Sequence, residues 1–166
     1  PGEAQRYAQW FSRQKGGAYS VPALGASGHV WGEFIKRHQA EFDKDPSMYA
    51  LRRAPDGTLK RMGPQIESTN PHVIDLFVQD IEDAFKKNGW PKDKKVAFGI
   101  GPADGLGFSV SVESQLASSG RIDPIMGAPD MTDLMVLLGN TILGRVNKEY
   151  PNVYVGYYSY SVHADY

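Results

Sequence analysis

Residues 96–105 read Val-Ala-Phe-Gly-Ile-Gly-Pro-Ala-Asp-Gly, an apolar run of strand length that opens at once into a glycine-rich turn. Apolar character at nearly every position of 96–100 is typical of a parallel strand that is buried on both faces. Ligands of parallel α/β proteins bind at the carboxyl ends of the strands, so Asp104 is the first candidate site residue. Ala-Asp-Gly is also favourable turn chemistry, and shaping the turn is the alternative role for Asp104.

Two long helices are predicted, one before and one after this strand in the sequence. Asn70-Pro71 supplies a cap and a first helical residue, and apolar residues then recur at helical spacing until Asn88-Gly89. Asp130 is predicted to cap a second helix from about residue 131 to 149, before a final strand over 153–159. Strands separated by helices imply parallel pairing with right-handed crossovers.

The remaining elements are predicted to be shorter. We expect a helix over 3–15, a strand over 18–21, a loop over 25–29, a helical segment over 30–42 and a short helix over 113–118. Asp56-Gly57 lies between short extended runs at 48–51 and 58–60, which predicts a β-hairpin. This hairpin is an insertion into the alternation of strands and helices.

Together these elements predict an α/β fold. We expect a single domain over 1–166, built as a partial (β/α) TIM-barrel-like unit with parallel strands, long helices and the inserted β-hairpin. A closed eight-stranded barrel typically needs about 250 residues, which is more than this chain has. Because the chain begins at Pro1 and stops soon after its last predicted strand, we expect a fragment of a larger protein. Its partner would then be the remainder of the barrel or another chain.

The composition narrows the classes of function. A net charge of −1 predicts no binding to nucleic acid. The chain has no cysteine, and no apolar run approaches the roughly 18 residues that a membrane span needs. The histidines show no His-x-x-x-His spacing, and neither Gly-Lys-Ser/Thr nor Gly-x-Ser-x-Gly occurs. We therefore expect no metal site, no bound cofactor, no phosphate loop and no serine nucleophile elbow.

His29 and Trp31 lie in a glycine-containing segment after the first predicted strand. An imidazole beside an indole suits sugar recognition, because the imidazole forms hydrogen bonds and the indole stacks on an apolar sugar face. The alternatives are a His29 bonded to the backbone and a Trp31 that anchors the core.

Aromatic and polar residues also crowd the end of the last predicted strand: Tyr158, Tyr160, His163 and Asp165. By the period of two, Tyr158 and Tyr160 share one face of the strand and form a candidate carbohydrate platform. Tyrosine is equally an ordinary strand residue, which is the alternative interpretation.

Several short motifs occur in order along residues 20–165. They are Gly28-His29-x-Trp31, Asp45-Pro46-x-x-Tyr49-Ala50-Leu51, Ser68-x-Asn70-Pro71, Gly101-Pro102-x-Asp104-Gly105, and Lys148-Glu149-Tyr150-Pro151 before a strand with Gly156 and Tyr160. In this order they resemble a bacterial family of unknown function whose members look like glycoside-hydrolase barrels. That family is similar in outline to α-glucuronidases and β-N-acetylhexosaminidases.

The resemblance implies a (β/α) barrel region, a carbohydrate ligand, and a periplasmic or extracellular location. It places His29, Asp104 and the Tyr160 region at the catalytic face. Relatives often carry a Cys-x-Cys-x-x-Cys run where this chain has residues 109–114, Ser-Val-Ser-Val-Glu-Ser, so that metal or disulfide role is absent. The Asp-Glu pair of hexosaminidases is also missing, so the resemblance does not extend to substrate-assisted catalysis.

Three functional hypotheses follow. In the first, the chain is a glycoside-hydrolase-like domain that acts on a polysaccharide or oligosaccharide, with Asp104 as one of the two carboxylates such enzymes need. Glu33, Glu67 and Asp165 are the candidates for the second carboxylate, with His29, Trp31, Tyr158, Tyr160 and His163 as substrate-binding residues. In the second hypothesis the chain binds carbohydrate without turnover, and in the third it is a structural part of a larger assembly.

Overall fold

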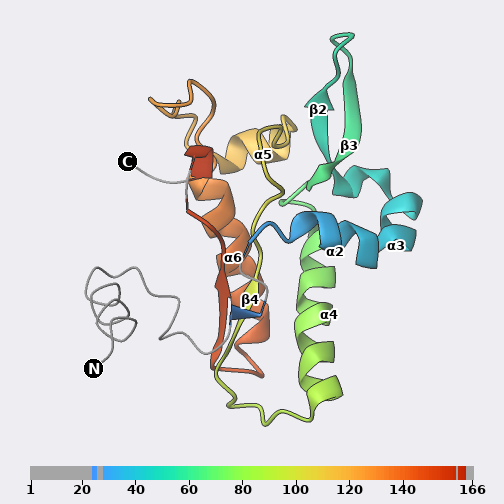
Figure 1. Cartoon of the computed structure of the whole chain (residues 1–166), viewed down its shortest axis with the longest axis vertical. Helices are drawn as coiled ribbons and strands as arrows, with labels where there is room; N and C mark the ends of the chain where they lie inside the picture. Colours follow the sequence, from blue (N-terminus) through green and yellow to red (C-terminus); the bar gives the residue numbers. More distant parts are fainter. Residues whose placement is uncertain (1–23, 26–27, 160, 164–166) are drawn as a thin grey trace, which may run out of the picture.

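A small parallel sheet lies at the centre of the structure, a computed structural model that describes residues 24–25, 28–159 and 161–163 (Figure 1). Within these residues the sheet order is β1 (Leu24–Gly25), β4 (Val96–Gly99), β5 (Val153–Gly156). Ala97 pairs with Leu24 on one side and with Tyr154 on the other, both in parallel register. The predicted parallel pairing of the strands near 96–100 and 153–159 is confirmed, although β5 ends at Gly156.

Two long helices pack beside this sheet and against each other, namely α4 (Pro71–Asn88) and α6 (Thr132–Val146). The predicted cap of α4 is present, because the Asn70 side chain accepts a hydrogen bond from the backbone of His72. The Asp130 carboxylate likewise accepts from the backbone of Thr132 at the start of α6. Gly139 allows α6 to lie close to the sheet, since an added Cβ would be 3.3 Å from Val155.

The structure also contains five shorter helices within the described residues. They are α2 (Trp31–Arg37), α3 (Gln39–Lys44), η1 (Pro46–Met48), α5 (Val112–Ala117) and η2 (Ser161–His163). The rings of Phe34 and Phe77 stack with centroids 4.0 Å apart and join α2 to α4. The predicted helical segment over 30–42 is divided into α2 and α3 at His38, whose backbone leaves the helical conformation.

The predicted hairpin is confirmed as an antiparallel pair, β2 (Tyr49–Arg53) and β3 (Leu59–Ile66). Its turn is held by the Asp56 carboxylate, which accepts hydrogen bonds from the backbone and the hydroxyl of Thr58. Figure 1 shows the hairpin projecting away from the parallel sheet. Its base returns to the core at Ile66, which is buried.

The structure shows a mixed α/β fold, and the described strands do not close into a barrel. The predicted helix over 3–15 and the predicted strand over 18–21 lie outside the described residues. The structure places β1 at Leu24–Gly25, so the prediction of a loop from residue 25 was wrong at its first residue. Residues 24 and 25 are extended because they pair with β4. A strand of two residues is too short to produce a recognisable pattern in the sequence.

Candidate functional site

The segments that follow β1 and β4 bring His29 and Asp104 together at the carboxyl edge of the sheet. The Nε2 atom of His29 lies 3.7 Å from Oδ1 of Asp104, and the two side chains are 35% and 80% exposed. These residues belong to different loops, so the juxtaposition is a product of the parallel pairing of β1 with β4. From the sequence, both residues were expected to follow strands, and the family resemblance implied a shared face for them.

A close backbone approach fixes the two loops to each other. The Val30 amide donates a hydrogen bond of 3.0 Å to the carbonyl oxygen of Gly101. A Cβ atom added at Gly101 would overlap the carbonyl oxygen of Gly28, so the approach requires glycine there.

The His29 ring is oriented by the second loop. Its Nδ1 lies 2.8 Å from the carbonyl oxygen of Pro102. A carbonyl oxygen can only accept, so Nδ1 donates this hydrogen bond. The alternative interpretation of His29, a hydrogen bond to the backbone, is therefore confirmed. The other ring nitrogen, Nε2, faces Asp104.

Asp104 lies in a loop that a buried glutamine holds in place. The carboxamide of Gln65 accepts from the Ala103 amide at 3.1 Å and donates to the Ala103 carbonyl at 2.9 Å. It also donates to the Gly105 carbonyl at 3.2 Å, so it contacts the backbone on both sides of Asp104. Sequence reasoning missed Gln65, because a single glutamine in a hairpin strand carries no recognisable signal. The Asp104 carboxylate accepts from the Gly105 amide, which confirms its turn-shaping role.

Tyr158 follows β5 and lies beside His29. The two rings are edge to face, with centroids 6.0 Å apart and an interplanar angle of 82°. Tyr158 is 47% exposed, and its ring borders Gly28. Tyr160 and Asp165 lie outside the described residues, and for His163 the structure describes the backbone in η2 but not the side chain.

The structure places Trp31 in the core rather than at a sugar-binding surface. Its side chain is fully buried, its Nε1 donates to the Ile100 carbonyl at 2.8 Å, and its ring meets Phe108 edge to face. The prediction of Trp31 as a substrate-binding residue was therefore wrong, and the core alternative is confirmed. Trp31 is the first residue of α2, and its indole contacts the chain directly after β4, at Ile100.

Glu33 lines a pocket together with His29. This pocket has a volume of about 270 Å³ and lies next to α4. The Glu33 carboxylate is exposed and pairs with Lys36 at 2.6 Å. Asp80 also lines this pocket, where it pairs with Arg37 and His38. Asp104 is close to Nε2 of His29, and Glu33 and Asp80 share the pocket that His29 lines.

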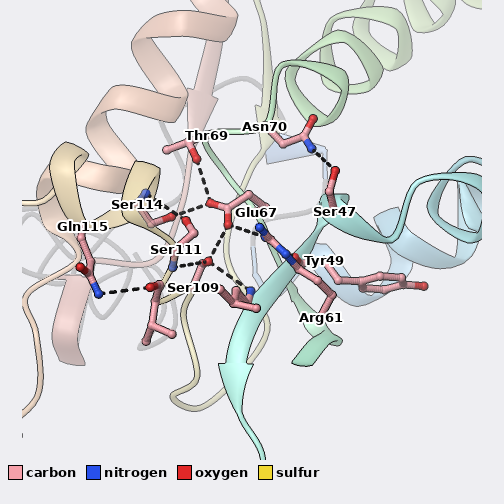
Figure 2. A network of polar contacts seen from close by, with 12 residues as sticks. Ser47, Tyr49, Arg61, Glu67, Thr69, Asn70, Ser109, Ser111, Ser114 and Gln115 are labelled. Carbon is pink, nitrogen blue, oxygen red and sulfur yellow. Dashed lines mark hydrogen bonds and ion pairs between the residues drawn. The ribbon is translucent and has the colours of Figure 1, made fainter. Parts of the chain in front are cut away.

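Glu67 has a different role, which Figure 2 shows. Its buried carboxylate accepts hydrogen bonds from Ser109 at 2.5 Å, Ser114 at 2.6 Å and Thr69 at 2.8 Å. It also pairs with Arg61 at 2.7 Å. Burial opposes ionisation, but the hydrogen bonds from Ser109 and Ser114 outweigh it and lower the pKa of Glu67.

The Glu67 cluster therefore joins the hairpin to the loop after β4 and to α5. The carboxylate is already held by four side chains, so we assign Glu67 a structural role rather than that of the second acid. From the sequence, Ser109 and Ser114 had no special role. Their partner is more than forty residues away in the chain, so local patterns could not reveal it.

Within the described residues, no three His, Asp or Glu side chains gather closely enough to hold a metal ion. No helix in this part of the chain combines the length and apolar character required to cross a membrane. Comparisons of the chain with protein-family models, with curated proteins and with solved structures find no match. The proposals below therefore depend on the geometry of the site.

Proposed function

We propose that the chain binds a saccharide at the carboxyl edge of its parallel sheet, through His29, Asp104 and Tyr158. The observation that carries the proposal is the 3.7 Å separation between His29 Nε2 and Asp104 Oδ1. The separation is longer than a direct hydrogen bond, and both atoms can form hydrogen bonds. Neighbouring hydroxyl groups of a sugar ring can each hydrogen-bond to one of these two side chains, because a hydroxyl both donates and accepts.

Tyr158 supplies the apolar part of the proposed site. Its ring is half exposed and lies edge to face with His29. A tyrosine combines an apolar ring with a polar hydroxyl, which matches a sugar with one apolar face and a polar rim. The pairing of hydrogen-bonding groups with an aromatic ring favours a neutral polyol over a charged or purely apolar ligand.

The architecture supports a glycoside-hydrolase-like setting for this site. Strands β1, β4 and β5 are parallel, and their order in the sheet is the order in which they occur in the chain. Helix α4 packs against α6. Successive strand–helix units in this order are how (β/α) barrels are built. We therefore propose that the sheet is a segment of such a barrel, with the saccharide at its carboxyl face.

Hydrolysis of the bound saccharide is the second candidate function. The observation that favours it is that His29 lies close to Asp104 and lines a pocket with Glu33. Asp80, which lines the same pocket, is held by Arg37 and His38. A pair of carboxylates is the usual requirement for glycoside hydrolysis. In this version of the proposal Asp104 reacts with the substrate and Glu33 supplies the second carboxylate.

Calorimetric titration with a panel of neutral oligosaccharides tests saccharide binding, and release of reducing ends tests hydrolysis. We expect binding by the native chain and weaker binding by Asp104→Asn, with Asp83→Asn as the matched control. Asp83 is exposed near the far end of α4. If Asp104→Asn loses turnover more strongly than binding, the chain is a hydrolase. If no saccharide binds, the proposal is wrong.

A further inference from the structure

A second pocket in the described part of the chain, larger than the one that His29 and Glu33 line, has no role in the proposed saccharide site. It has a volume of about 520 Å³, within the range of about 300 to 1,000 Å³ that is typical of small-molecule sites. Its walls come from the loop after β4, from α5, from the loop before α6 and from η2, with Leu106, Phe108, Ile122, Met131 and Val162 among its residues.

The wall of this pocket is mostly apolar, and its serines and Gln115 donate hydrogen bonds within the protein. The Gln115 amide donates to the Val110 carbonyl. The hydroxyls of Ser109 and Ser114 donate to the buried Glu67 carboxylate. The hydroxyl of Ser118 donates to the Asp130 carbonyl. Because these hydrogens are committed within the protein, the pocket favours a ligand group that makes few hydrogen bonds.

The pocket adjoins the proposed saccharide site through the loop after β4. Asp104 and Leu106 are two residues apart, so their Cα atoms are separated by at most about 7 Å. Leu106 lines the pocket and is 49% exposed, so the pocket wall begins two residues beyond Asp104 in the chain.

A second segment makes the same connection independently. Tyr158 belongs to the saccharide site and Val162 to the pocket, and the four intervening steps span at most about 14 Å. The Val162 carbonyl accepts from the Met131 amide, which ties this segment to the pocket wall. Two segments of the chain therefore link residues of the proposed saccharide site to residues that line the pocket.

We propose that the ligand is an amphiphilic glycoside whose sugar contacts His29, Asp104 and Tyr158 and whose apolar aglycone occupies the pocket behind Leu106. This inference rests on the proposed saccharide binding and adds the chemical class of the group attached to the sugar. An alkyl aglycone is the form that the wall favours, because it needs no hydrogen bonds.

Paired glycosides test this inference. Methyl and octyl β-glycosides of glucose, galactose and N-acetylglucosamine are titrated calorimetrically into the full chain, with 1-octanol as the apolar probe, all below micelle-forming concentrations. We expect the octyl form of the preferred sugar to bind at least tenfold more tightly than its methyl form, because burial of two or more methylenes suffices for that gain.

A matched pair of leucine variants locates the gain. Leu106→Ala is expected to remove most of the octyl advantage while methyl glycoside binding persists, and Leu116→Ala is expected to retain the advantage. Leu116 is 81% exposed on α5 and does not line the pocket, and both leucines are exposed enough for alanine to be tolerated in folding.

The outcomes separate the two proposals. Equal binding of methyl and octyl forms, both weakened by Asp104→Asn, would overturn the aglycone site and leave saccharide binding intact. Equal binding of octanol and every octyl glycoside, unaffected by Asp104→Asn, would overturn both. An octyl advantage that Leu106→Ala leaves unchanged would place the alkyl chain elsewhere and would also overturn the aglycone site.

Discussion

The amide of Val30 donates a hydrogen bond to the carbonyl oxygen of Gly101, and this contact joins the loop after β1 to the loop after β4. Together with the hydrogen bond from His29 to the Pro102 carbonyl, it holds His29 within 3.7 Å of Asp104. The site therefore depends on a backbone approach that only glycine permits, because a Cβ at Gly101 would meet the Gly28 carbonyl.

Gly101→Ala is expected to separate the two loops, to destabilise the fold by about 1 to 3 kcal/mol and to abolish saccharide binding. Gly144→Ala is the control, because Gly144 lies inside α6 with open space around its Cα. That variant should gain about 0.5 to 1 kcal/mol from helix propensity. Urea denaturation measures both changes, and equal stability of the two variants would contradict the role of the Gly101 approach.

Asp104→Asn is expected to weaken saccharide binding about tenfold or more, since a hydrogen bond to a charged group contributes roughly 1.5 to 3 kcal/mol. The asparagine side chain can still accept from the Gly105 amide, so the turn is preserved. The free energy of unfolding should therefore change by less than about 0.5 kcal/mol. A lower free energy of unfolding with unchanged saccharide affinity of the folded variant would contradict this role. Asp104 would then only shape the turn.

Glu67→Gln is expected to destabilise the fold by about 2 to 4 kcal/mol at pH 7, because it removes the charge that compensates Arg61. The folded state lowers the pKa of Glu67, so the unfolded state binds more protons in the interval between the two pKa values. The contribution of Glu67 is therefore fully present above its ordinary pKa of about 4.3 and is lost as pH falls below that value toward the folded-state pKa.

Urea denaturation of the native chain and of Glu67→Gln between pH 7 and pH 3 measures this dependence. The difference between the two should shrink as the solution becomes acidic. Glu33→Gln is the matched control, because its exposed pair with Lys36 contributes less than about 1 kcal/mol. A difference for Glu67→Gln that stays constant across this range would contradict the ionised, hydrogen-bonded carboxylate.

Trp31→Phe is expected to cost about 1 to 3 kcal/mol of stability, because the Ile100 carbonyl loses its indole donor in a buried position. Since the indole is fully buried, saccharide affinity of the folded variant should stay within about twofold. Calorimetry on the folded variant checks this. A large loss of affinity with unchanged stability would restore the sugar-stacking role.

Local sequence signals were enough for the long elements. Helix α4 begins at the predicted Asn70-Pro71 and ends before the predicted Gly89, because capping and helical spacing are encoded within a few residues. The hairpin was found from Asp56-Gly57 for the same reason. The two-residue strand β1 depends on pairing with β4, which is distant in the chain, so its position was not visible locally.

The site was predictable only in part. His29 and Asp104 were found because both follow strands, and parallel strands bring such positions to one edge. The burial of Trp31 depends on how α2 packs against β4, and its sequence context is the same for a core and a surface residue. The clamp of Gln65 on the Asp104 loop and the Glu67 cluster depend on contacts between distant segments, which a single sequence does not reveal.

The most direct test of saccharide binding at this edge is amide chemical-shift mapping of the full chain during titration with the saccharide that calorimetry selects. The largest changes are expected at residues 28–30, 101–105 and 157–159, with little change at the far end of α4. Saturable changes confined to the projecting hairpin or to α4, with the residues around His29 and Asp104 unaffected, would contradict the proposed site.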